Sequence, residues 1–195
     1  MVIANFRLFN KRLIKFCKKK NSKFILYFIS FIESIFFPLP TDPFLIPFVI
    51  AEKKFFINTV FVTFFSVLGG VIAYFIGNIL WENLESHIIT FFPSIGESIK
   101  VFQNEFSEVG FLLIVIGGFS PFPYKVTCLG SGILGINLFG FIFFSLVSRG
   151  ARFFLVSFLT YKYGEMAINF IQKYILRISF IILVIILFVF FKNYY

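Results

Sequence analysis

Five ionisable side chains lie in stretches of the sequence that are otherwise strongly apolar. They are two carboxylates and three cations, namely Glu33, Asp42, Lys125, Arg149 and Arg152. An ionised group in hydrocarbon costs about 3 kcal/mol or more, so such groups usually pair with one another or line a pathway. Guanidinium groups bind phosphate oxygens in pairs, and a membrane carboxylate can take up and release a proton. The set therefore favours an anion site with an exchangeable proton.

Two other interpretations of the same residues stay open. Glu33 and Asp42 can simply neutralise the arginines and fix pairs of helices. Arg149 and Arg152, which are three residues apart and share one helix face, can instead extend to the membrane surface beside Lys162. Buried ion pairs are poor devices for stability alone, so the set as a whole favours a functional site, with the arginines and Lys125 holding a phosphate.

Composition indicates that these residues lie in a bilayer. Of 195 residues, 59% are hydrophobic and only 14% are charged, which is too apolar for a soluble domain of this length. We therefore expect an all-α integral membrane protein. The excess of basic residues is concentrated in residues 1–23, which contain no acid. Such a block before an apolar segment is typical of a cytoplasmic flank, so we expect a cytoplasmic, amphipathic N-terminus that contacts anionic lipids and not nucleic acid.

Three segments are long enough to span a membrane, and two apolar segments are interrupted. The predicted spans are 58–80, 136–160 and 174–191. The interrupted segments are 24–51 and 109–133, and their breaks contain the prolines Pro38, Pro40, Pro43, Pro47, Pro121 and Pro123. Proline breaks a helix, and non-helical backbone at membrane depth is tolerated only where protein or a water-filled cavity covers it. Each interrupted segment is either a kinked span or a re-entrant hairpin whose tip lies at Pro38, Pro40 and Pro43 or at Pro121 and Pro123.

Charge favours the hairpins. Lys53 and Lys54 follow the first interrupted segment, and the acidic stretch 81–108 precedes the second, as a cytoplasmic turn and an external loop would. Both breaks share the pattern Phe-x-Pro-x-Pro-x-charge, starting at Phe36 and at Phe119. We therefore predict two inverted-topology repeats, each a re-entrant hairpin followed by a transmembrane helix. A last transmembrane helix follows them in residues 166–195.

Enzymatic chemistry is not expected. The single histidine, His87, lies in the acidic stretch, and no Cys–His or Ser–His–Asp arrangement lies near a predicted hairpin tip. Cys17 and Cys128 have no metal-binding or redox spacing. No glycine-rich nucleotide loop is present. We predict a protein without catalytic residues, cofactor or metal, and a homo-oligomer remains open.

Three stretches together resemble the DedA superfamily, also called VTT-domain or SNARE-associated Golgi-type membrane proteins, and most of all its YqaA-like branch. They are FIESIFFPLPTDPFLIP, GGFSPFPYKV and SRGARFFLV, and the resemblance covers residues 24–165. It implies oppositely oriented re-entrant hairpins in the bacterial inner membrane. It also implies lipid movement between leaflets, with polyprenyl phosphates as bacterial substrates and proton coupling. We therefore expect a lipid transporter or flippase, and the alternative is a non-transporting envelope scaffold.

The resemblance also implies roles for individual residues. Glu33 and Asp42 correspond to the essential membrane acids of that superfamily. The chain departs from the pattern in the second hairpin, where Gly118 occupies the place of an arginine and only Lys125 follows. Arg149 and Arg152 are the basic residues that the YqaA-like branch offers instead. This departure concerns the phosphate-binding residues and so bears on the identity of the lipid.

Overall fold

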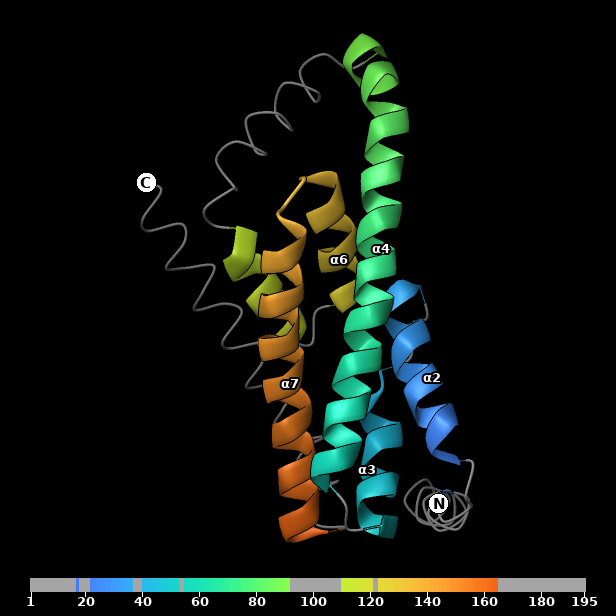
Figure 1. Cartoon of the computed structure of the whole chain (residues 1–195), viewed down its shortest axis with the longest axis vertical. Coiled ribbons are helices and arrows are strands. Elements are labelled where there is room, and N and C mark those ends of the chain that lie inside the picture. The colour runs from blue at the N-terminus through green and yellow to red at the C-terminus, as the bar shows by residue number, and fades with distance from the viewer. Residues whose placement is uncertain are drawn as a thin grey trace, which may run out of the picture.

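The computed structural model describes Cys17 and residues 22–36, 40–52, 55–91, 110–120 and 123–164. All regular secondary structure in these residues is helical. Two long helices, α4 (Phe55–Phe91) and α7 (Leu138–Tyr163), run along the length of the molecule in opposite directions (Figure 1). Both are long and apolar enough to cross a membrane. The all-α prediction is confirmed at this level, because the described residues are helical and contain two candidate spans.

Both long helices extend beyond their predicted bounds. The span predicted at 58–80 is part of α4, which continues to Phe91 and therefore includes the start of the stretch 81–108 that we expected to be a loop. No proline or glycine interrupts residues 78–91, so nothing in the sequence stops the helix before Pro93. With 37 residues, α4 is about 55 Å long, which exceeds the apolar thickness of a bilayer. The second span, predicted at 136–160, is α7 with a shift of two or three residues.

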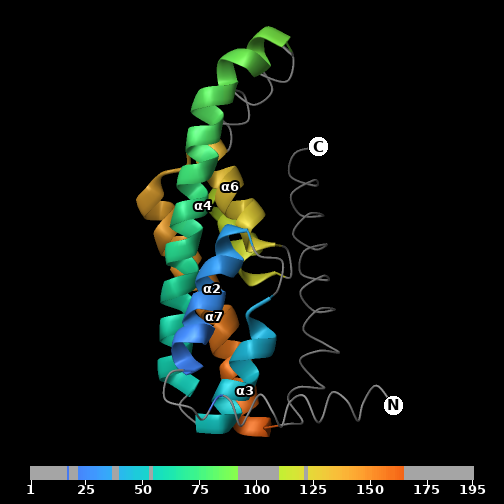
Figure 2. The same ribbon diagram turned by 90° about the vertical axis from the view of Figure 1, so that its right-hand side faces the viewer.

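The first interrupted segment folds back on itself. Helix α2 (Ser22–Ile35) leads into a break, and α3 (Asp42–Glu52) returns. Its two ends meet, because Lys23 Nζ lies 2.7 Å from Glu52 Oε2. The segment is therefore a helical hairpin and not a kinked span (Figure 2).

The prolines of this segment act differently from one another. Pro40 lies in the break, whereas Pro43 is the second residue of α3, where a missing N–H costs little. The interruption predicted at Pro47 is wrong, because α3 continues through it. Leu45 and Phe48 on either side are buried in a core cluster that holds the helix together.

The second interrupted segment is also a helical hairpin. It consists of the helix Gly110–Phe119 and of α6 (Tyr124–Ile133). A Cβ atom on Gly117 would overlap the side chain of Thr127, and one on Gly110 would lie 2.7 Å from Cδ1 of Ile136. Because the first residues of one arm approach the end of the other, the two arms are antiparallel.

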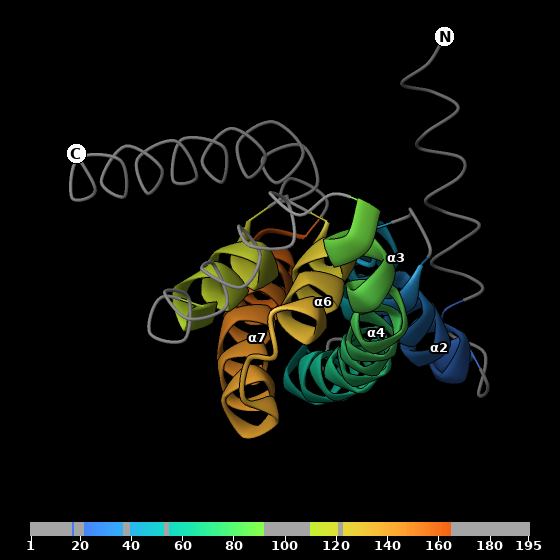
Figure 3. The ribbon, with the colours of Figure 1, turned by 90° about the horizontal axis from the view of Figure 1, so that it is seen from above.

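The two hairpins occupy opposite halves of the long helices. Helix α2 packs against one half of α4, α3 packs against the same half of α7, and α6 packs against the other half of α4 (Figure 1). The view along the long helices in Figure 3 shows α2 and α6 on different sides of α4. One apolar cluster lies in each half. The first is centred on Leu26, Leu45 and Phe153, and the second on Tyr74 and Phe141. The tips of the two hairpins meet between these clusters.

Glycines on α4 set its spacing from both hairpins. Gly69 contacts the backbone carbonyl of Phe31 on α2, Gly70 contacts the ring of Tyr124, and Gly77 contacts the carbonyl of Leu129 on α6. Small residues at such positions let helix backbones approach closely in membrane proteins. The sequence pattern Gly69, Ala73 and Gly77 is therefore explained by packing.

A methyl group at one of these contacts should destabilise the fold. In Gly69→Ala the new Cβ would overlap the Phe31 carbonyl, which is backbone and cannot rotate away. We expect a loss of about 1–3 kcal/mol, as for other overpacked sites, measured by thermal unfolding in detergent. Gly130→Ala is the matched control, because a Cβ there meets nothing within 4 Å and alanine favours a helix by about 0.5–1 kcal/mol. Equal stability of the two variants would contradict the close packing of α2 on α4.

Candidate functional site

The five predicted ionisable residues converge where the two hairpin tips meet. Glu33 lies near the end of α2, and Asp42 is the first residue of α3. Lys125 lies in the first turn of α6, and Arg149 and Arg152 lie on α7. We call Glu33, Asp42, Arg149 and Arg152 the four-charge layer. It separates the two apolar clusters and joins segments that are more than 100 residues apart in sequence.

Arg149 is the most buried member of the layer, with 3% of its surface exposed. One terminal nitrogen donates to Glu33 Oε2 at 3.0 Å, and its Nε donates to Ser66 Oγ at 2.9 Å. The guanidinium also lies against the rings of Tyr124 and Phe153, at 4.7 and 4.6 Å from their centroids. Arginine tolerates such a place because aromatic faces and a carboxylate together replace water around the cation.

Arg152 joins the two helix breaks. Its Nη2 lies 2.5 Å from Asp42 Oδ2, at the start of α3. Its Nη1 donates to the Ser120 carbonyl at 2.5 Å, where the helix Gly110–Phe119 has ended. A carboxylate at a helix N-terminus and a cation at a helix C-terminus are both favourable positions for those charges. Arg152 thus donates to a backbone carbonyl at the break of the second hairpin and pairs with the acid at the break of the first.

Part of this second ion pair is without a partner. Asp42 Oδ1 and Arg152 Nε are buried, and neither has a hydrogen-bond partner within the described ranges. Each group can therefore make one further hydrogen bond without breaking the pair. These two atoms are the unused hydrogen-bonding capacity of the layer.

Lys125 connects the tips without pairing with an acid. Its Nζ donates to the backbone carbonyl of Phe36 at 3.1 Å, just after α2 ends. No carboxylate in the described part of the chain forms an ion pair with it. Together with the four-charge layer, which has two charges of each sign, Lys125 gives the tip region a formal charge of +1.

This geometry decides between some of the interpretations of the arginines. Extension of Arg149 and Arg152 to the membrane surface is wrong, because their side chains are only 3% and 13% exposed and point to the hairpin tips. The structure shows each arginine paired with an acid, Arg149 with Glu33 and Arg152 with Asp42. Of the predicted tip prolines, Pro40 lies in the first break and Pro123 directly precedes α6, whereas Pro43 belongs to α3. Pro38 and Pro121 lie outside the described residues.

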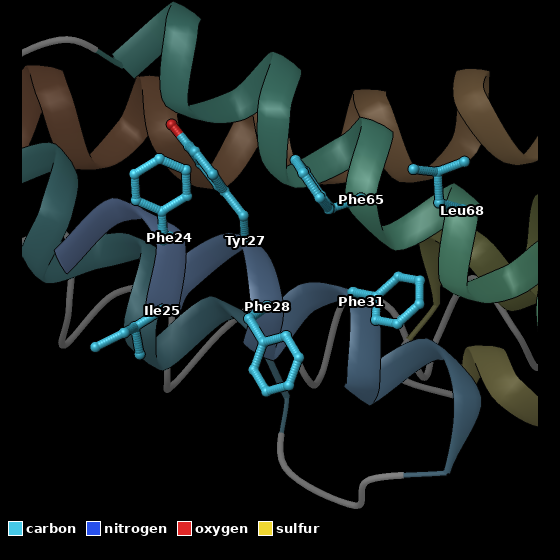
Figure 4. A pocket seen from close by; sticks show the side chains of 7 residues that line it. All are labelled: Phe24, Ile25, Tyr27, Phe28, Phe31, Phe65 and Leu68. Atoms are coloured by element: carbon cyan, nitrogen blue, oxygen red, sulfur yellow. The ribbon is translucent and has the colours of Figure 1, made fainter. Parts of the chain in front are cut away.

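Three grooves among the described residues are lined mainly by apolar side chains, and none of their lining residues belongs to the four-charge layer. The groove between α2 and α4 has a volume of about 500 Å³, and Figure 4 shows aromatic rings along it. It is lined by Phe24, Ile25, Tyr27, Phe28, Phe31, Phe65 and Leu68. Such a surface suits lipid chains and carries no group for chemistry. Among the described residues no three His, Cys, Asp or Glu side chains are grouped as metal ligands.

Comparison with known proteins places the chain among relatives of similar length. An uncharacterized protein of Haemophilus influenzae is 37% identical over 153 residues, which cover 78% of this chain and 79% of that protein. The uncharacterized protein HI0703 homolog of Histophilus somni is 31% identical over 144 residues, which cover 73% and 74%. The chain belongs to their family. Family resemblance extends to uncharacterized protein MJ0201 of Methanocaldococcus jannaschii, 26% identical over 126 residues, which cover 65% of this chain and 75% of that protein.

No protein-family model matches the chain, and no solved structure matches it. The names of these three relatives state no activity. The function of the family must therefore be inferred from the geometry of the site.

The sequence did not point to the polar residues that complete the layer. Thr41 Oγ1 donates to the same Glu33 oxygen that accepts from Arg149. Ser34 Oγ and Ser66 Oγ lie 2.8 Å apart, and Ser66 accepts from Arg149. Ser30 and Ser34 could have indicated this polar contact, because they are four residues apart in an apolar segment and therefore share one face of the helix.

Proposed function

We propose that this chain is a membrane lipid transporter of the DedA type, which moves a phosphate-bearing lipid across the bilayer in a proton-coupled manner. The observation that carries the proposal is the four-charge layer, because it gathers two carboxylates and two arginines where two helix breaks meet. Ionisable groups at membrane depth mark substrate and proton pathways. Transporters often place their sites between broken helices at the interface of two repeats.

The proposal includes the topology. The two hairpins are re-entrant, enter the bilayer from opposite sides and belong to two inverted repeats, each completed by α4 or by α7. This arrangement is supported by the hairpins' positions in opposite halves of the molecule and by the contact between their tips. The basic N-terminus is cytoplasmic, and the membrane is the bacterial inner membrane. A polyprenyl phosphate is one candidate substrate, and the protein acts without cofactor or catalytic residue.

The ion pairs give a physical basis for proton coupling. A phosphate cannot bind Arg149 or Arg152 fully while Glu33 and Asp42 occupy their donors. Protonation of either acid removes its charge and weakens that pair, so a phosphate oxygen can take the place of the carboxylate. When the lipid leaves, the acid loses its proton and pairs again. Phosphate and carboxylate thus compete for the same arginine, and proton uptake favours lipid binding.

The test uses reconstituted vesicles and a labelled polyprenyl phosphate, compared with ordinary phospholipids, with and without a pH gradient. We expect wild-type protein to move the phosphate lipid faster under the gradient. Arg152→Ala should abolish movement, and Glu33→Gln should reduce the response to the gradient, because Asp42 is then the one acid of the layer that can take up a proton. Lys162→Ala on α7 and Glu82→Gln on α4 are matched controls, because both side chains are exposed far from the layer. Absence of movement of any lipid by folded wild-type protein would overturn the proposal.

One observation favours a second candidate, a non-transporting membrane scaffold. Both arginines already have a carboxylate partner, as in an ion-pair network that only joins helices. A scaffold would keep its function in Glu33→Gln as long as the protein inserts and accumulates normally. The same variants therefore separate the two candidates.

A further inference from the structure

A second set of unpaired polar atoms lies inside the bundle, away from the four-charge layer. Asn58 on α4 and Ser157 on α7 are both 0% exposed. The amide nitrogen and oxygen of Asn58 and the hydroxyl of Ser157 have no hydrogen-bond partner within the described part of the chain. A buried polar group without a partner costs about 1–3 kcal/mol. Three such atoms in one region therefore need a common explanation.

The helix register places Asn58 and Ser157 opposite each other. Helices α4 and α7 are antiparallel, and Arg149 Nε on α7 contacts Ser66 Oγ on α4. Asn58 lies eight residues before Ser66 on α4, and Ser157 lies eight residues after Arg149 on α7. Since the helices are antiparallel, both residues lie about 12 Å along the bundle from the Arg149–Ser66 bond, on the same side of it. The ring of Phe55 contacts those of Phe154, Phe158 and Tyr161, at 6.0, 6.1 and 5.0 Å between centroids, so this end of α4 lies beside the part of α7 that contains Ser157.

The chemistry of this pair fits water. The amide offers two donors and an acceptor, and the hydroxyl offers both functions. Buried waters typically make about three hydrogen bonds to polar groups that lack other partners. Two side-chain oxygens are too few for calcium, which takes about six to eight oxygen ligands. The neighbouring side chains Val62 and Phe153 are apolar and buried. They cannot form hydrogen bonds with these polar atoms, so a small polar ligand is needed to do so.

We propose that Asn58 and Ser157 hold an internal water site, and that protons pass through it to the Glu33–Arg149 pair. The route begins at the end of the bundle where Lys23 meets Glu52. This second statement rests on the proposed proton-coupled function, whereas the water site does not. Hydroxyl groups continue the polar column toward the pair, because Ser30 Oγ donates to the Val62 carbonyl at 2.9 Å and Ser34 contacts Ser66.

The water site is tested by radiolytic hydroxyl-radical labelling, in which a bound water oxidises the side chains beside it. Phe153 is the probe, since it is 1% exposed and lies in the same cluster as Val62. We expect Phe153 to be labelled in the wild-type protein, and Asn58→Leu/Ser157→Ala should reduce this labelling several-fold. The labelling of Phe141, which lies in the other cluster with Tyr124, should be the same in the wild-type protein and in the variant. If the double variant folds poorly, Ser157→Ala alone is the smaller change to use. We expect it to lose part of the labelling of Phe153.

Two outcomes would overturn the water site. One is a wild-type Phe153 that is not labelled. The other is undiminished labelling of Phe153 in the folded variants, which would place the water elsewhere, for example beside Arg149.

The proton route is tested in vesicles with a labelled polyprenyl phosphate. Asn58→Leu should lose the stimulation by a pH gradient and keep the movement seen without one. Asn83→Leu is the matched control on the same helix, because Asn83 is exposed and bonds only within its own helix. Full stimulation in Asn58→Leu would overturn the route. If wild-type protein shows no stimulation, the proton coupling of the proposed function fails and the route with it, and the labelling experiment still decides the water site.

Discussion

Arg149→Met alone is expected to lower the free energy of unfolding by about 3–5 kcal/mol, because it leaves the Glu33 carboxylate buried without its cation. The double variant Arg149→Met/Glu33→Gln should recover most of that loss. It has no buried charge at this position, and the amide oxygen of the introduced glutamine can still accept from Thr41. The measurement is thermal unfolding in detergent together with the yield of folded protein by size-exclusion chromatography.

The ion pair at the base of the first hairpin provides the matched control for this prediction. Lys23 is 32% exposed in its side chain, so solvent screens its charge when Glu52 is replaced. Glu52→Gln should therefore cost only about 0–1 kcal/mol, and adding Lys23→Met should change little. If the Arg149 double variant is as unstable as the single variant, the pair is held together by packing of the arginine and not by compensation of charge.

The sequence predicted the elements well because its strongest signals are local. Hydrophobic runs indicated α4 and α7, and prolines indicated both helix breaks, since these depend on residues that are neighbours in the chain. The end of α4 was predicted less well. Acidic residues after Leu80 pointed to a loop, but charged side chains extend a helix into water as readily as they form a loop.

The candidate site was predicted by residue type and not by pairing. An ion at membrane depth must find a partner, so the sequence indicated that Glu33, Asp42, Arg149 and Arg152 belong together. It could not indicate that Glu33 pairs with Arg149 and Asp42 with Arg152, because this depends on how α2 and α3 pack against α7. Lys125 illustrates the limit. Its position at the second tip was predicted, but its contact with a backbone carbonyl depends on the exact end of α2.

Loss of transport without loss of fold is the second large effect that we expect, and Arg152 is the residue to show it. The double variant Arg152→Gln/Asp42→Asn removes both charges of one pair, so no uncompensated ion remains and the folded yield should stay near that of wild type. The amide group of the introduced glutamine can still donate a hydrogen bond to the Ser120 carbonyl. What the variant lacks is a cation for the phosphate and an acid for the proton.

A hydrogen bond to a charged group contributes about 1.5–3 kcal/mol, and each 1.4 kcal/mol corresponds to about tenfold in binding. Movement of a labelled polyprenyl phosphate by this double variant should therefore fall at least about tenfold, with unchanged thermal unfolding. Undiminished movement would remove Arg152 from the headgroup site and leave this pair a structural link between the hairpins. Because the two charges are removed together and thermal unfolding is unchanged, a loss of stability cannot account for the loss of movement.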